Sequence, residues 1–305
     1  MKSYSLSQQL SSKTGIALFI ALAAAALIFP GCSANNAYQA PVQMEVQLRT
    51  SATLGSYLTD KDGRTLYYFA TDSVTVNTCT SPACMGKWPV YYSDKLSATT
   101  TGTGLTFSDF GMITTSGGAK QTTYKGRPLY YYAPAGDGVR EAVGATSGEA
   151  VGNVWFVAKP DYTIMITRAQ LVGLNGKNYT FTITSPTPTY VEGDGKSSYF
   201  TDAHGVALYI FKPDKQNTNT FTKADLSNNS VWPVYEMDKI VVPSILDKTQ
   251  FGVITVYGKK QMTYKGWPLY YFGQDAMTMG FTKGVSQPTP GMWPIATKDL
   301  VPATP

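Results

Sequence analysis

Short runs without a polar residue recur along the chain, separated by residues that favour turns. Four of these runs begin Leu-Tyr and span residues 66–69, 129–132, 208–211 and 269–272. Alternate residues of a strand point to opposite faces, so a run with no polar position predicts a strand buried on both sides. The dipeptides Asp62-Gly63 and His204-Gly205 precede two of the runs and predict hairpin turns.

Other segments also favour strands. Residues 162–167 and 252–257 are rich in Ile, Val and Thr, and residues 173–176 (Gly-Leu-Asn-Gly) predict a further hairpin turn. After the first 31 residues no segment has a convincing helical period, and residues 223–227 could form at most one helical turn. Only 15% of the residues are charged, while 21 are Tyr. The predicted fold class is all-β.

The chain is a tandem duplication. Residues 56–72 match residues 198–214 at nine of 17 positions without a gap. Further matches follow in the same order: Trp88-Pro-Val-Tyr with Trp232-Pro-Val-Tyr, residues 123–131 with 263–271, and residues 155–158 with 293–296. The offset stays between 138 and 144 residues throughout. Such constant spacing indicates two homologous β domains.

Each half is itself twofold, because each contains two of the Leu-Tyr runs. A Trp follows the end of each run after 19 to 23 residues. The repeat aromatics are therefore Tyr67, Tyr130, Tyr209 and Tyr270, with Trp88, Trp155, Trp232 and Trp293. Four sub-repeats are compatible with a sandwich, a barrel or a four-bladed propeller. We expect domains at residues 46–175 and 176–305, with a linker-like Pro-rich stretch at 185–189.

The N-terminus is typical of an export signal. Lys2 and Lys13 precede an apolar run over residues 16–29, which as a helix would extend about 21 Å and is short for a bilayer. The following Pro30-Gly31-Cys32-Ser33 resembles a bacterial lipobox, although Phe29 stands where Leu is usual. We therefore expect a signal peptide at 1–31, lipid on Cys32, and a tether over 32–45. Ordinary cleavage nearby, with a free cysteine, is the alternative.

Two further cysteines, Cys79 and Cys84, are separated by four residues. In an oxidising compartment they predict a disulfide, although a redox-active pair stays possible. The chain has 25 Lys and Arg against 20 Asp and Glu, and two of the lysines lie in the predicted signal. The remaining excess is small and unclustered, which argues against nucleic acid as a partner.

A repeated element, Tyr-x-aromatic-x-x-Asp, stands at residues 67–72, 209–214 and 270–275. In the remaining copy two extra residues precede Asp137. With Cys79, Cys84 and Trp88-Pro89, the element resembles the bacterial secreted-repeat lipoproteins named for a Y-x4-D motif, over roughly residues 50–160 and 195–298. The second copy lacks the Cys pair, and Asn228 stands where Cys84 would align. The resemblance implies export, lipidation and tandem repeats, and it implies no reaction.

Four aspartates are the best candidates for a site: Asp72, Asp137, Asp214 and Asp275. They follow equivalent strands, so symmetry could gather them into a Ca²⁺ or other cation site. Alternatively, each could cap its own turn. The Tyr and Phe side chains could form an aromatic platform for sugar rings or quinones, or could pack within the core.

Little in the sequence indicates catalysis. His204 is the single histidine and is expected to be a solvated turn residue. Met277-Thr-Met279 only weakly suggests copper ligation. Nucleophile-elbow, phosphate-loop and metalloprotease motifs are missing, so a hydrolase is the least favoured class.

We expect a non-enzymatic binding or structural lipoprotein of the bacterial envelope, lipid-anchored in the outer membrane, without a cofactor. Its expected partners are the membrane, through the lipid, and envelope proteins or polysaccharide. The alternative is a redox or metal-binding accessory in extracytoplasmic electron transfer.

Overall fold

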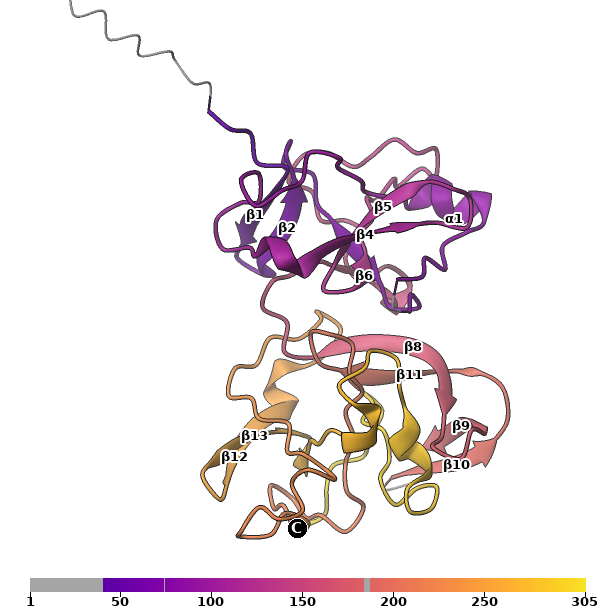
Figure 1. The fold of residues 1–305 in the computed structure, drawn as a ribbon, viewed down its shortest axis with the longest axis vertical. Coiled ribbons are helices and arrows are strands. Elements are labelled where there is room, and N and C mark those ends of the chain that lie inside the picture. Colours follow the sequence, from indigo (N-terminus) through magenta and orange to yellow (C-terminus); the bar gives the residue numbers. More distant parts are fainter. Residues whose placement is uncertain (1–40, 74, 184–186) are drawn as a thin grey trace, which may run out of the picture. The chain divides into compact units, whose positions relative to one another are not determined.

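The computed structural model describes residues 41–73, 75–183 and 187–305 (Figure 1). Strands account for 32% of the residues and helices for 8%, which confirms the all-β class. The strands form five small sheets, and none of the sheets closes on itself over the described ranges. The predicted signal segment and Cys32 lie outside the described residues, as do Ser185 and Pro186 of the predicted linker.

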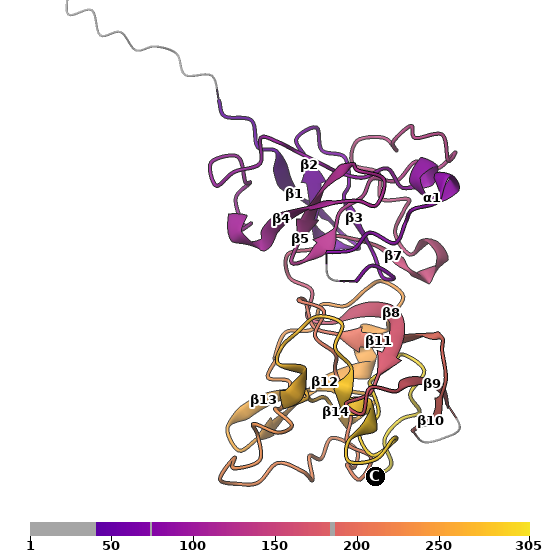
Figure 2. The same ribbon diagram turned by 45° about the vertical axis from the view of Figure 1, so that its right-hand side comes forward.

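The first copy of the repeat spans residues 50–160, and its first strand begins slightly earlier, at Val46. Its strands are β1 (Val46–Ser51), β2 (Gly55–Asp60), β3 (Tyr67–Phe69), β4 (Phe110–Thr114), β5 (Lys120–Tyr124), β6 (Arg127–Pro128) and β7 (Trp155–Val157). The strands pair with one another in antiparallel fashion: β1 with β2, β3 with β7, and β4 with β5 with β6. The short strands β3 and β7 are seen in Figure 2.

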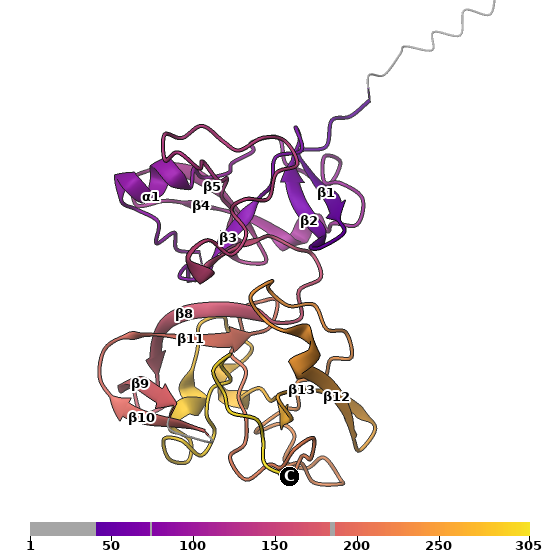
Figure 3. The same ribbon diagram turned by 180° about the vertical axis from the view of Figure 1, so that it is seen from behind.

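The second copy (residues 195–298) follows a connecting hairpin. The strands from this point are β8 (Met165–Val172), β9 (Asn178–Ile183), β10 (Pro188–Glu192), β11 (Lys196–Thr201), β12 (Phe251–Val256), β13 (Lys259–Tyr264) and β14 (Trp267–Pro268). They form sheets ordered β10-β9-β8-β11 and β12-β13-β14. Figures 1 and 3 show the β12–β13 hairpin and the β9–β10 hairpin on opposite sides of this part.

Several predicted elements are confirmed, with shifted limits. The predicted strand 252–257 is β12, while the predicted strand 162–167 begins only at Met165 as β8. The predicted turn at 173–176 joins β8 to β9. The domain limit predicted near residue 175 falls in this turn, and the division itself stays a prediction. The predicted linker at 185–189 runs into β10 at Pro188.

Helices are few and short. The single α-helix in the described ranges, α1 (Pro82–Lys87), is capped by Ser81, whose side chain accepts from the Cys84 N–H. The 3₁₀ turns are Phe107–Asp109, Val151–Asn153, Lys248–Gln250, Gly273–Asp275 and Lys283–Ser286. The predicted helical turn at 223–227 is an isolated turn closed by a hydrogen bond from the Leu226 N–H to the Lys223 carbonyl. No sequence pattern predicts α1, because six residues are too few for a helical period.

Of the four Leu-Tyr runs, one forms a ladder and three form isolated bridges. The first run contains β3, whereas the other three bridge their partners only through Tyr130, Tyr209 and Tyr270. The reason is that their backbone groups bond to several segments in turn. The backbone of Tyr130, for example, pairs with that of Tyr67, while the backbone N–H of Tyr131 donates to the Pro89 carbonyl. The runs are nevertheless extended and buried on both sides, as the pattern predicted.

Candidate functional site

At the centre of each copy, the two sub-repeats meet through one pair of tyrosines. In the first copy the Tyr67 N–H donates to the Tyr130 carbonyl at 2.8 Å, and the Tyr130 N–H returns the bond at 2.9 Å. Tyr209 and Tyr270 form the same reciprocal pair in the second copy, at 2.8 and 2.9 Å. An antiparallel pair of equivalent residues places a local twofold axis between them. Each copy is therefore a pseudo-symmetric dimer of sub-repeats.

The repeat tryptophans stack across this axis. Trp88 and Trp155 lie face to face, with ring centroids 3.8 Å apart and planes 4° apart. Trp232 and Trp293 repeat this geometry at 3.8 Å and 6°. All eight repeat aromatics are at most 5% exposed. The structure therefore places them in the core rather than on a surface platform.

Each of the four tyrosine phenols donates a hydrogen bond to a buried carboxylate of the other sub-repeat. Tyr130 donates to Asp72 at 2.6 Å, Tyr270 to Asp214 at 2.7 Å, Tyr209 to Asp275 at 2.6 Å, and Tyr67 to Glu141 at 2.5 Å. The bonds therefore exchange partners across the twofold axis. We call these four contacts the phenol–carboxylate pairs.

The second oxygen of each carboxylate closes a loop of its own sub-repeat. Oδ1 of Asp72 accepts from the N–H and hydroxyl of Thr78, and Oδ1 of Asp214 accepts from the same two groups of Thr220. Asp275 accepts from the Lys283 N–H at 2.9 Å. Because both oxygens have partners, each carboxylate joins its own loop to the opposite sub-repeat.

Asp137 does not take part in this arrangement. It is exposed and accepts only the Val139 N–H, at 2.9 Å. Glu141 occupies its place, since its Oε1 accepts from Tyr67 and its Oε2 from the N–H and hydroxyl of Ser147. The prediction that Asp137 is equivalent to the other three aspartates is therefore wrong. The insertion before it moves the aspartate into the solvent, and a longer acidic side chain further along replaces it.

Burial dominates the electrostatics of these pairs. It raises the pKa of Asp72, Asp214 and Asp275 to about 6, although the hydrogen bonds from tyrosine and backbone oppose the rise. Burial and the adjacent carboxylate raise the pKa of Tyr130 and Tyr270 well above its usual range. The phenols therefore stay protonated and act as permanent donors.

The predicted disulfide between Cys79 and Cys84 is present, with the two Cα atoms 5.5 Å apart. It ties the start of α1 to the loop that precedes it. In the second copy Asn228 replaces Cys84, and its Nδ2 donates to the carbonyl of Phe221, which stands where Cys79 aligns. Its Oδ1 also accepts from the Lys223 N–H. The amide therefore closes by hydrogen bonds the loop that the disulfide closes covalently.

The remaining candidates lie apart from the phenol–carboxylate pairs. His204 is exposed in its turn, and its N–H donates to Asp202. Met277 is exposed, while the Met279 side chain packs against Gly126 and Gly205. Over the described ranges, no three His, Cys, Asp or Glu side chains come close enough to share a metal ion. The four candidate aspartates are therefore not gathered into one group.

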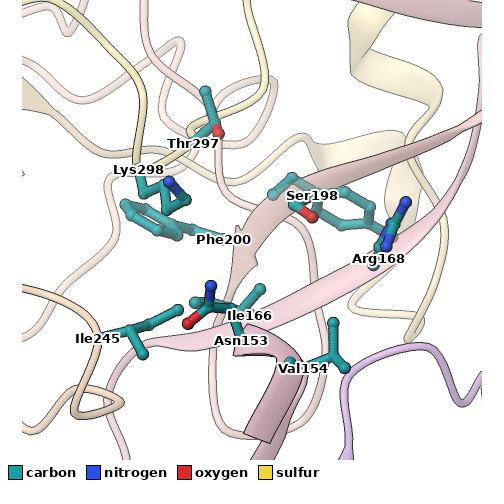
Figure 4. Close-up of a pocket in the computed structure, with 11 residues that line it drawn as sticks. Asn153, Val154, Ile166, Arg168, Ser198, Phe200, Ile245, Thr297 and Lys298 are labelled. Carbon is teal, nitrogen blue, oxygen red and sulfur yellow. The ribbon is translucent and has the colours of Figure 1, made fainter. Parts of the chain in front are cut away.

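A pocket of about 140 Å³ lies against the paired strands β8 and β11 (Figure 4). Its floor is formed by Ile166 and Phe200, which face each other across the strands. The exposed Arg168 and Lys298 stand at its edge, and the Lys298 ammonium pairs with Asp299 at 2.9 Å. The apolar floor and the cationic edge suit one small molecule that has an apolar body and a negatively charged group. The pocket is too small for a polymer.

A more open depression of about 280 Å³ lies on the first copy, beside the edge strand β4. We call it the aromatic groove. Tyr92, Phe107 and Met112 line it and are 37%, 43% and 55% exposed. Asp94 also lines the groove and is exposed.

The second copy differs at the corresponding place. Glu236 and Lys248 stand where Tyr92 and Phe107 align, and Glu236 is paired with Lys259 at 2.7 Å. The aromatic groove is therefore a feature of the first copy. No sequence signal marks the residues of the groove, because they lie outside the repeated motif.

Comparison with known families supports the repeat assignment. The chain matches a family model described as a secreted repeat of unknown function over residues 49–91, 111–159 and 253–297. Each stretch contains one Leu-Tyr run and the repeat Trp that follows it. Residues 198–235 lie outside these three stretches but carry the same geometry through Tyr209 and Trp232. No curated protein and no solved structure matches the chain.

Proposed function

We propose that the protein is exported and acts as a lipid-anchored binding module that holds envelope polysaccharide, which is supported by its three matches to the secreted repeat of unknown function. The lipid would be attached to Cys32 and would anchor the protein in the outer membrane. The described part of the chain contains no helix with the length and apolar character needed to cross a bilayer.

The use of the buried acidic groups supports a non-enzymatic role. A catalytic carboxylate must reach the substrate, whereas Asp72, Asp214 and Asp275 each have both oxygens occupied by internal donors. The networks join the two sub-repeats of a copy and would make it rigid. A rigid frame is what a binding surface needs in order to keep its shape.

The aromatic groove is the observation that carries the binding proposal. Sugar rings stack their apolar faces on exposed aromatic side chains, and Tyr92 and Phe107 supply such faces. Asp94 lies beside them with its carboxylate exposed, where it can accept hydrogen bonds from sugar hydroxyls. The groove is also open, so a polymer can cross it without being threaded.

Glycan binding can be tested with the mature protein. Insoluble envelope polysaccharide is incubated with the wild type, with Tyr92→Ala and with a control, Tyr257→Ala, whose tyrosine is 56% exposed in the second copy. We expect Tyr92→Ala to reduce binding at least tenfold and the control to bind as the wild type does. Equal binding by all three proteins, or no binding by the wild type, would reject the groove as a glycan site.

The anchor has a separate test. Mass spectrometry of the mature protein from bacterial membranes should find Cys32 as the first residue, carrying acyl chains. An unacylated mature N-terminus would refute the anchoring while leaving the binding proposal open.

A second candidate, accessory electron transfer, is favoured by one observation. The face-to-face pair Trp88 and Trp155 adjoins Tyr130, whose phenol already donates to Asp72, so the carboxylate could accept the proton if the tyrosine were oxidised. Elemental analysis and visible spectroscopy of the protein purified from its own membrane decide this case. A colourless, metal-free protein with an unreactive disulfide would remove it.

A further inference from the structure

Arg127, in β6, is a buried cation without a counter-ion. Its side chain is 2% exposed and makes no ion pair within the described residues. Nη2 donates to the hydroxyl of Thr167 at 2.9 Å and to that of Thr201 at 3.3 Å. The guanidinium carbon lies 5.3 Å from the centre of the Tyr68 ring. All of these contacts are with uncharged groups, and none of the ion pairs among the described residues includes the guanidinium.

Two of its nitrogens also have no acceptor. Within the part of the chain that the structure describes, the buried Nε and Nη1 of Arg127 lack a hydrogen-bond partner, as does the buried hydroxyl of Tyr68. Burying a polar N–H without a partner costs about 1–3 kcal/mol, and more when the group is charged. Several unsatisfied donors in one place therefore call for an acceptor, and a negatively charged one would best offset the guanidinium.

A small cavity of about 10 Å³ adjoins these groups. Three cationic side chains line it, Lys125, Arg127 and Lys159, and no carboxylate does. Lys125 is bonded to the Pro160 carbonyl at 2.8 Å, and burial lowers the pKa of Lys159. The volume suffices for about one atom-sized occupant and excludes sulfate, phosphate or a carboxylic acid.

Three acidic side chains from the surrounding segments have hydrogen-bond or ion-pair partners other than Arg127. Asp72 bonds to Tyr130 and Thr78, and Glu149 bonds to the Val157 N–H and the Ser244 hydroxyl. Asp161 lies near Lys159 but pairs with Lys239 at 3.0 Å. None of them is within ion-pair distance of the guanidinium.

The second copy solves the same position differently. Trp267 stands where Arg127 aligns, and its indole N–H donates to the Val301 carbonyl at 2.8 Å. The fold therefore accepts an uncharged, fully satisfied side chain at this site. The buried charge of the first copy is then a specific feature rather than a requirement of the repeat.

We propose that the cavity beside Arg127 binds one monatomic anion, chloride in the envelope, held by the unpaired guanidinium nitrogens and by the positive charge of Lys125 and Lys159. The bound ion neutralises the guanidinium and accepts the hydrogen bonds that the protein leaves unmade. Because Thr167 and Thr201 lie in β8 and β11, the ion also stabilises the contact between β6 and these two strands.

Bromide gives the direct test, because it replaces chloride and scatters X-rays anomalously. Crystals of the mature wild type soaked in sodium bromide should show an anomalous peak within hydrogen-bond distance of Nε or Nη1 of Arg127. A peak absent from this cavity, with ordinary water density in its place, would overturn the proposal. This measurement needs no substitution and so does not depend on the folding of a variant.

Thermal unfolding gives an independent test. In sodium chloride the wild type should melt about 3 °C higher than in sodium gluconate of equal ionic strength, at a tenfold excess of chloride over its Kd. Arg127→Gln should lose this difference, and the exposed control Arg168→Gln should keep it. Equal melting of the wild type in both salts, or a chloride effect retained by Arg127→Gln, would contradict the proposal.

Discussion

The phenol of Tyr270 donates a hydrogen bond of 2.7 Å to Asp214, 56 residues earlier in the chain and in the other sub-repeat of the same copy. The reciprocal bond, from Tyr209 to Asp275, is 2.6 Å long. The Tyr and the Asp of one Tyr-x-aromatic-x-x-Asp motif therefore do not bond to each other. Each motif supplies a donor to its partner and takes an acceptor from it, which explains why Tyr and Asp recur together.

The three buried aspartates predict that stability falls as the pH rises from about 4 to about 7. Burial raises their pKa to about 6 from the ordinary 3.8, so the folded protein binds more protons than the unfolded chain between these values. Their contribution is then complete below the unfolded pKa and is lost as the pH rises through the folded pKa. Each pKa unit corresponds to about 1.4 kcal/mol.

Urea unfolding at several pH values measures this dependence. Asp214→Asn should reduce the slope, because the amide does not ionise, whereas the exposed Asp137→Asn should leave it unchanged. A wild type that becomes more stable between pH 4.5 and pH 7 would show that ionisation of these groups is not penalised by burial.

At Gly148 and Gly284 the core is packed too closely to accept a larger side chain. A Cβ on Gly284 would lie 2.8 Å from the Tyr209 ring and 2.9 Å from Trp232, and one on Gly148 would lie 2.8 Å from the Tyr67 ring. Neither the rings nor their phenol–carboxylate pairs can move freely. We expect Gly284→Ala to lower the free energy of unfolding by about 1–3 kcal/mol.

The matched control is Gly117→Ala, since the nearest atom to a Cβ there is the Thr115 hydroxyl at 4.0 Å. Chemical denaturation should find it within about 0.5 kcal/mol of the wild type. If both alanines were equally harmless, the close packing around Tyr209 would be refuted.

The disulfide and Asn228 predict two chemically different closures of one loop. Reduction of Cys79–Cys84 should lower stability by about 2 kcal/mol, as the loop is short. Asn228→Ala removes two hydrogen bonds and should lower it by about 1–2 kcal/mol. Unfolding curves with and without reductant give both values. The effect of Asn228→Ala should be the same in either condition, and dependence on reductant would indicate that the two loops are coupled.

Sequence patterns were sufficient for the features that depend on short stretches of chain. The duplication, the turns at Gly63 and Gly205, and the buried Leu-Tyr runs follow from local spacing and apolar character. The disulfide also follows, since Cys79 and Cys84 are five positions apart in a chain that is predicted to be exported.

The partners of the candidate site could not be predicted in this way. Tyr67 and Glu141 are 74 residues apart, and the acidic residue that takes the motif position lies beyond an insertion and is not an aspartate. Nothing local marks it, because Glu141 and Asp137 are both plausible loop acids. The burial of Arg127 could not be predicted either, because no local pattern indicates that β8 and β11 cover its charged side chain.

A double-mutant cycle on Tyr270 and Asp214 tests most directly the claim that the repeated motif exists to join the sub-repeats. The free energy of unfolding is measured for the wild type, Tyr270→Phe, Asp214→Asn and the double variant, with the exposed Tyr257→Phe replacing Tyr270→Phe in a control cycle. We predict a coupling of at least about 1 kcal/mol between Tyr270 and Asp214 and none in the control. A coupling indistinguishable from zero between Tyr270 and Asp214 would contradict the account.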